Sequence, residues 1–325
     1  SRSTAIGHGA LFAQNFTTAT DTNNVAVGYQ AGVAVTTGVN NTLIGALAGD
    51  ALTDADHNVA VGRASLSADT LGSKSIAIGF GALGSQNFTT ATDTHNVAVG
   101  FNAGVNVSTG TKNTAIGSDC GSRITTGDEN TFLGYLAGVY AVPTLTGQDN
   151  IVIGAYSHVT ASDGDAANIL GYNVAGAAGY TTVGNAGNDA RLGHGSASWA
   201  TVSDRRYKKD IVNSTAGLSF INDLTPRTFK YKNLGELPEA FNAYEADSTE
   251  VFKNSNINHG FIAQEVKVAI DAHSEIKDGF KLWDDRDDGS QEVAEAALIP
   301  ILVKAIQEQN ALIVALTARV ATLEG

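Results

Sequence analysis

The stretch "GALFAQNFTTATDTNNVAVGYQAGV" spans residues 9–33 and returns as "GALGSQNFTTATDTHNVAVGFNAGV" over residues 81–105. The two copies lie 72 positions apart (81 − 9), so the chain carries an internal duplication. A shorter unit recurs within and around them, in forms such as "NNVAVG", "NNTLIG", "KSIAIG" and "ENTFLG". Repeats of this size are typical of proteins that stack one structural unit on the next.

A closing glycine sets the period of the short unit. Successive closing glycines are 17 to 21 positions apart, most often 17, at Gly7, Gly28, Gly45, Gly62, Gly79, Gly100, Gly117, Gly134 and Gly154. "NILG" and "TTVG", ending at Gly171 and Gly184, read as degraded last copies. A 17-residue unit with two short strands and two turns predicts one coil of a parallel β-solenoid, because such a coil buries its faces only by stacking. The longer spacings predict the same coil with a longer turn, as in "NFTTATDT".

Each coil has the same pattern before its glycine. A β-branched residue such as Val25 lies three positions before it and Val27 one before, with Ala26 between them. Side chains of a strand alternate between two faces, so we expect a second, small-residue face that another surface covers closely. Large hydrophobic residues are sparse in these repeats. The pattern therefore predicts a partner chain on the alanine face and a trimer of parallel β-rolls. A second short strand is expected after each glycine, followed by a polar turn.

Composition divides the chain in the same place. Thirty of the 36 glycines lie in residues 1–200, and the net charge of the whole chain is −13. An acidic chain without a basic block is a poor candidate for binding nucleic acid. No apolar run approaches the ~20 residues that span a bilayer, so we expect no membrane insertion. The absence of methionine and of a visible signal peptide indicates an excerpt or a processed product.

The single cysteine excludes an intrachain disulfide framework and a multi-cysteine metal site. Cys120 lies three residues after Gly117, where other coils carry alanines such as Ala103 and Ala137. We therefore interpret it as a small buried hydrophobic residue and not a reactive thiol. The histidines show no metal-ligand spacing, so we expect neither a metal nor a cofactor.

The end of the chain, from residue 296 to 325, predicts a coiled-coil helix. Apolar residues alternate at steps of three and four, with Gln309 in one core position. The apolar members of this seam are Ile299, Leu302, Ile306, Ile313, Leu316, Val320 and Leu323. A strict heptad of this kind favours self-association, although an amphipathic helix packed on its own domain would show a related pattern. Pro300 falls in the first turn or two, where proline is tolerated.

Between the repeats and this helix lies "WATVSDRRYKKDI", residues 199–211. Ser203 is a potential nucleophile, and Lys208, five residues later, is a potential base. By itself this spacing carries little weight. The basic residues from Arg205 to Lys209 suit a solvated strand edge or a docking patch equally well.

The order of segments around this seam resembles a known family. "SDRRYKKDI" is followed by "GLSFINDLTPRTFKY" (217–231), "HGFIAQEV" (259–266) and "LIPILVKAIQEQNALI" (298–313). Over roughly residues 199–323 this resembles the auto-cleaving intramolecular chaperone domain of phage endosialidases, tailspikes and tail fibres. Over roughly residues 3–190 the repeats resemble the head repeats of trimeric autotransporter adhesins and the shafts of phage tail fibres.

The resemblance implies a Ser203/Lys208 dyad that cleaves the chain between Val202 and Ser203 in a single turnover, without turnover of external substrates. The hypothesis that follows for His259 is that it orients or polarises the site, whereas a satisfied structural histidine is the favoured interpretation. Glu265 is expected to be a structural polar residue and not a catalyst.

We therefore expect a mainly β chain with three parts. Residues 1–198 would form a trimeric β-roll shaft, residues 199–295 a small α+β chaperone domain, and residues 296–325 a trimeric coiled coil. The expected function is host attachment as part of a phage tail fibre or tailspike in the virion. Expected partners are two further copies, other tail or baseplate proteins, and a host-surface glycan or protein receptor. The alternatives are a cell-surface trimeric adhesin, or a fibre that keeps its C-terminal domain as an uncleaved tip.

Two further patterns point to functions that we do not expect. "DDRDDGSQEVAE" from Asp284 resembles a calcium loop, but Arg286 occupies a ligand position and the flanks read as strands around a turn. A glycan-degrading enzyme would need a recurrent pair of carboxylates in the β-region, and the repeats carry their aspartates mainly in turns.

Overall fold

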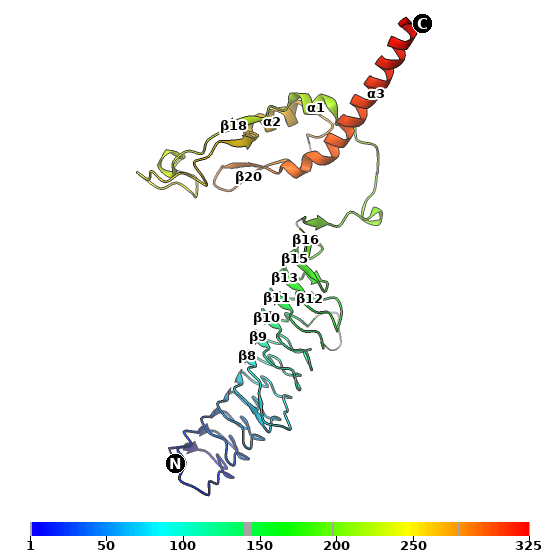
Figure 1. Cartoon of the computed structure of the whole chain (residues 1–325). Coiled ribbons are helices and arrows are strands. Elements are labelled where there is room, and N and C mark those ends of the chain that lie inside the picture. Colours follow the sequence, from blue (N-terminus) through cyan, green and yellow to red (C-terminus); the bar gives the residue numbers. More distant parts are fainter. Residues whose placement is uncertain (1, 140–144, 197, 278–279, 325) are drawn as a thin grey trace. The chain divides into compact units, whose positions relative to one another are not determined.

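The computed structural model describes residues 2–139, 145–196, 198–277 and 280–324 (Figure 1). It divides into two compact units, Ser1–Asp204 and Arg205–Gly325. Each unit has a hydrophobic core of its own. The first consists of short strands and turns, and the second combines short strands with three α-helices.

The first unit is the predicted β-solenoid. One strand per coil pairs with its counterpart one coil later, and the strand order is β1-β2-β3-β4-β6-β8-β9-β10-β11-β13-β15-β16-β17. All pairs from β1 to β15 are parallel, and the last two pairs are antiparallel. The strands are β1 (Thr4–Ile6), β2 (Val25–Val27), β3 (Thr42–Ile44), β4 (Val59–Val61), β6 (Ile76–Ile78), β8 (Val97–Val99), β9 (Thr114–Ile116), β10 (Thr131–Leu133), β11 (Ile151–Ile153), β13 (Asn168–Tyr172), β15 (Tyr180–Asn185), β16 (Asn188–Gly193) and β17 (Ala200–Thr201).

The expected second strand after each glycine is wrong for most coils. Among the described residues the other strands of this unit are two short pairs, β5 (Gly72–Ser73) with β7 (Thr92–Asp93) and β12 (His158–Val159) with β14 (Ala175–Gly176). Elsewhere the chain turns after the glycine, as at Gln30, where φ is 53°, and Gly32, where φ is 58°. Left-handed residues at alternate positions are incompatible with an extended strand.

The alanine face of each strand is the interior of the solenoid, which corrects the placement of the partner chain. Ala26, Ala60 and Ala98 are completely buried within this one chain. They pack in a core that includes Leu43 and Phe132. Leu43 and Phe132 occupy the same central strand position in their own coils, so this interior face also accommodates larger side chains. The β-branched residues point outward instead, so the face that the chain leaves open is the Val/Ile face.

The closing glycines are required by this stacking. Gly28 has a φ of +137°, and a Cβ placed on it would lie 2.5 Å from the carbonyl oxygen of Gly45 in the next coil. Any side chain there would collide with backbone and adopt a conformation that L-residues avoid. The repeat period read from these glycines is therefore the period of the coils.

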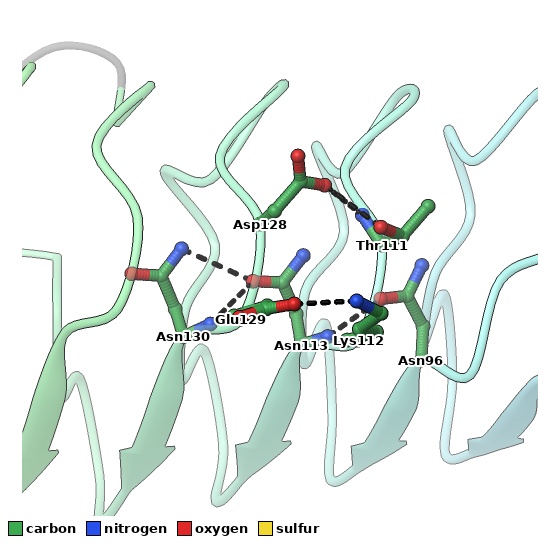
Figure 2. A network of polar contacts seen from close by, with 7 residues as sticks. All are labelled: Asn96, Thr111, Lys112, Asn113, Asp128, Glu129 and Asn130. Carbon is green, nitrogen blue, oxygen red and sulfur yellow. Dashed lines mark hydrogen bonds and ion pairs between the residues drawn. The ribbon is translucent and has the colours of Figure 1, made fainter.

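An asparagine ladder runs inside the stack and was not predicted. The amide group of Asn113 donates to the carbonyl of Gly127 at 2.8 Å, and its side-chain oxygen accepts the backbone N–H of Asn130 at 3.0 Å. The oxygen of Asn96 in turn accepts the N–H of Asn113 at 2.8 Å. Figure 2 shows these three asparagines beside the outer contacts of Lys112 with Glu129 and of Thr111 with Asp128. Each asparagine thus satisfies a buried turn and the following coil together.

The second unit packs short elements around a small core of Phe220, Val266, Ile270, Leu282 and Ile301. Its described residues form two antiparallel strand pairs, three α-helices and three 3-10 turns. In chain order these are η1 (Arg205–Tyr207), α1 (Leu218–Asp223), β18 (Arg227–Phe229), η2 (Leu234–Glu236), β19 (Asn258–Gly260), α2 (Ala263–Ala272), β20 (Trp283–Asp285), β21 (Gln291–Val293), η3 (Glu295–Leu298) and α3 (Ile299–Glu324). The expected mainly β class with a long terminal helix is confirmed, and the trimer stays a prediction.

Candidate functional site

The predicted scissile bond follows the last strand of the solenoid. β17 ends at Thr201 and pairs with β16, which holds the chain up to that point. Val202 is 55% exposed, and Ser203 is also exposed and outside any helix or strand. The peptide between them is therefore anchored on its N-terminal side by strand pairing.

Lys208 belongs to the second unit, whereas Ser203 belongs to the first. The 3-10 turn η1 separates them in sequence, and the backbone N–H of Lys208 donates to the carbonyl of Arg205 at 3.1 Å. Lys208 is exposed within its own chain. Lysines that act as bases are usually buried. The pairing of Ser203 with Lys208 stays a prediction.

His259 lies in β19 opposite Thr228 of β18, and its side chain is exposed. Beside it, Phe229 and Tyr231 stack edge to face with ring centroids 5.4 Å apart. This places His259 on an ordered strand pair of the second unit. Its role at the site stays a prediction.

Glu265 forms a two-point ion pair with Arg227, which agrees with a structural role. The guanidinium donates to the two carboxylate oxygens at 3.0 and 2.9 Å and joins α2 to β18. These hydrogen bonds lower the pKa of the Glu265 carboxyl below its usual value. A carboxylate held in this way is a poor general base, because its proton affinity is reduced.

His273 is a buried titratable residue of this unit, and the sequence led to no prediction for it. Its Nε2 lies 2.8 Å from Asp223 at the end of α1, and its Nδ1 lies 3.0 Å from Glu275. The hydrogen bond with Asp223, followed by that with Glu275, raises the pKa of His273 above its usual value. Its ring also stacks edge to face on Phe220. No motif marks this residue in the sequence, since its partners lie in separate segments.

The seam of α3 is open along the helix. All seven apolar seam residues are between 41% and 84% exposed, whereas Ile301 and Ala305 on another face are buried in the unit. Glu295–Glu324 is also, among the described residues, the one helical stretch long and apolar enough to cross a membrane. This differs from the expectation, drawn from the longest apolar runs, that no segment would be long and apolar enough to span a bilayer. Length and composition are weak grounds for a membrane span, and the three–four spacing of the apolar residues favours helix association.

The loop that resembles a calcium site is a β-hairpin, as expected from its flanks. β20 pairs with β21 across the turn. Asp288 accepts the backbone N–H of Asn242 at 3.0 Å and hydrogen bonds from Ser290, and these lower its pKa to about 2. Within the described ranges, no group of three or more His, Cys, Asp or Glu residues is placed to hold a metal.

Comparison with known proteins finds one similarity. Residues 203–274 match the family model described as chaperone of endosialidase. No curated protein and no solved structure matches the chain. The match starts at Ser203, directly after the solenoid, and ends just beyond His273. It supports the resemblance seen in the motifs of this region, but leaves the likeness of the repeats to adhesin heads unshown.

Proposed function

We propose that this chain is a structural component of a phage tail fibre or tailspike in the virion, whose C-terminal region assembles three copies and then cuts itself free. One observation carries the proposal: a match to the chaperone of endosialidase begins at Ser203, immediately behind a β-solenoid. Host attachment through the shaft or its neighbours is part of the same proposal.

The solenoid gives a physical reason for such a device. Its strands pair one coil apart in near-identical repeats, so many shifted registers are close in energy. Topologies with few local contacts fold slowly and expose unpaired edges. A C-terminal coiled coil would raise the local concentration of the three chains and align them before the shaft closes.

The open Val/Ile face is where we place the other two copies. Ile44, Ile78 and Ile116 point outward from the sheet and are 39%, 38% and 38% exposed. In the strands of the main sheet from β2 to β11, which exclude the short pair β5 and β7, no outward residue carries a charge. An uncharged apolar strip repeated at every coil suits contact with an identical strip.

The proposed cleavage is an acyl shift followed by hydrolysis. Ser203 Oγ attacks the carbonyl carbon of Val202 while Lys208 takes the hydroxyl proton. The C–N bond breaks as that proton passes to the leaving amine, which leaves an ester between Val202 and Ser203 Oγ. Water hydrolyses the ester, giving a carboxylate on Val202 and restoring the Ser203 hydroxyl. Once the C-terminal region is released, the shaft could no longer unfold by the reverse of its assembly. The shaft would then be kinetically stable.

Intact mass under denaturing conditions tests this proposal. Freshly expressed protein should split between Val202 and Ser203, whereas Ser203→Ala and Lys208→Ala should stay whole at 33.5 kDa. Lys209→Ala is the matched control, since it removes the adjacent lysine, and it should still cleave. If the unchanged protein stays whole and trimeric, the C-terminal region is a permanent tip and the dyad is wrong.

A further inference from the structure

We infer that Glu308 couples self-association of α3 to the segment that carries Lys208, which makes it a positioning residue for self-cleavage. This inference rests on the proposed function. It arises from a contact between α3 and the beginning of α1, two elements 90 residues apart in sequence that lie side by side in the second unit.

The contact is a charge-assisted hydrogen bond. The backbone N–H of Leu218, the first residue of α1, donates to Glu308 Oε2 at 2.8 Å. Lys304, one turn earlier on α3, lies 3.2 Å from the other carboxylate oxygen. The Leu218 N–H and then Lys304 lower the pKa of Glu308. The carboxylate is therefore ionised at neutral pH and occupies the positive end of α1.

The residue before α1 has no side chain, which leaves space for the Glu308 carboxylate. Gly217 precedes α1 and supplies no side-chain cap to it. A Cβ on Gly217 would lie 2.4 Å from Glu308 Oε2, so a side chain there would displace the carboxylate from its present position. The N-terminus of α1 is thus capped from α3 in place of a local Ser, Thr, Asn or Asp.

Glu308 lies between two seam positions on α3, Ile306 and Gln309. The N-terminal part of α3 holds its own unit through Ile301 and Ala305, whereas every described residue from Gln309 onward is exposed. When three seams associate, the rotation of each α3 about its axis becomes fixed. Glu308 would then fix the start of α1 relative to the seam.

The other end of α1 is already held by the contact of Asp223 with His273. With both ends fixed, the segment from Arg205 to Gly217 has an anchored C-terminal end. That segment carries Lys208. Ala216 and Phe220 are also buried in the core of this unit, so without the Glu308 contact α1 would stay packed. Only the hold on its first residue would be lost, and the segment that carries Lys208 would then be less well positioned.

The test compares assembly with cleavage in the full chain. Glu308→Ala should still form the trimer in sedimentation experiments, but should release the shaft about tenfold more slowly or worse, because a lost charge-assisted hydrogen bond corresponds to at least that ratio. Glu308→Gln keeps an acceptor and should recover most of the rate. Gln307→Ala, an exposed neighbour on the same helix, should cleave like the unchanged protein.

Hydrogen exchange at the Leu218 amide provides an independent reading in the uncleavable Ser203→Ala protein. Protection should increase with assembly and disappear in the Glu308→Ala, Ser203→Ala double variant. Cleavage of Glu308→Ala at the normal rate would overturn the inference, as would loss of its trimer, which would make Glu308 merely structural. If the unchanged protein does not cleave at all, the proposed function fails and this inference falls with it.

Discussion

At the scale of single residues, Gln86 takes over where the asparagine ladder is interrupted. Ser75 stands where the neighbouring coils carry Asn58 and Asn96, and the buried Gln86 reaches into that gap. Its oxygen accepts from Asn96 at 2.8 Å, and its amide donates to Asp69 at 2.6 Å and to Ser75 at 2.8 Å. Burial raises the pKa of Asp69, although hydrogen bonds from the backbone of Phe88 and from Gln86 oppose that shift. This cluster marks one coil as different from its neighbours.

Gln86→Leu should therefore destabilise the shaft strongly. The change leaves Asp69 and Asn96 with buried polar groups that lack a partner, and we expect a loss of about 2–4 kcal/mol in the free energy of unfolding. Chemical denaturation followed by circular dichroism measures it.

The duplication supplies a matched control. Gln14 is the counterpart 72 positions earlier, and its amide donates to Ser3 at 3.3 Å in a partly buried position. Gln14→Leu should cost less than about 1 kcal/mol, since its polar surroundings keep access to water. Equal losses of unfolding free energy in the two variants would show that the hydrogen bonds of Gln86 to the Asp69 cluster do not stabilise the shaft more than the single contact of Gln14 does.

The sequence could not reveal this ladder or its repair. Asn58, Ser75 and Asn96 precede strands in turn-like segments, and asparagine and serine in turns normally serve their own turn. Here each partner is supplied by a coil about 17 residues away. By contrast, the sequence did place Cys120 correctly in an alanine position: it is fully buried, and burial raises the pKa of its thiol to about 12.

At the scale of elements, His273 fastens α1 to the end of α2. A neutral imidazole can donate from only one nitrogen, yet both nitrogens face carboxylates, of Asp223 and Glu275. The protonated ring satisfies both. Because the side chain is only 9% exposed, solvent can replace little of what the ring loses on deprotonation.

The second unit should therefore weaken as pH rises. The folded-state pKa of His273 lies above its unfolded value near 6.5, so its stabilisation is complete below that value. It is lost as pH rises through the folded-state pKa. Thermal melts of the uncleavable Ser203→Ala protein between pH 5.5 and 9 should show the melting temperature of this unit falling with pH.

Substitution of the histidine checks the assignment. His273→Gln should flatten that pH dependence, whereas His259→Gln, which changes an exposed histidine of the same unit, should leave it unaltered. A melting temperature that falls equally in all three proteins would place the titrating group elsewhere.

Element types followed from the sequence more readily than element contacts. The heptad spacing predicted the terminal helix, with Pro300 in its first turn, because periodicity is a local property. The contact of Glu308 with Leu218 depends on a fold that brings α3 beside α1, and no spacing encodes it. The same holds for His273, whose partner Asp223 lies 50 residues away.

At the scale of the whole molecule, alternation alone could not decide which face of each strand is the core. Val25, Ala26 and Val27 are all apolar, so period two separates two faces without assigning them. Judged by size, the valines and not the alanine were expected to face the interior of the solenoid. The solenoid reverses this: the central residue of each strand faces the interior, as alanine in β2, β4 and β8 but as Leu43 in β3 and Phe132 in β10.

Because the Val/Ile face points outward, substitutions on it can test whether this face forms the contact between copies of the shaft. In a shaft carrying Ile78→Lys and Ile116→Lys, six lysines would face one another in a trimer without compensating charge, and burying them is unfavourable. After cleavage, the unchanged shaft fragment should sediment as a trimer and the doubly substituted one as a monomer. The fragment with α3 should remain trimeric in both, because its seam is untouched.

Thr90→Lys provides the control, since Thr90 is exposed on the longer turn between β6 and β8 and lies outside the 13-stranded sheet. It should leave the shaft trimeric. A doubly substituted shaft that stays trimeric would mean that copies meet on another face, and the outward valines and isoleucines would then need a different partner. A shaft that falls apart even when unchanged would assign all of the self-association to α3.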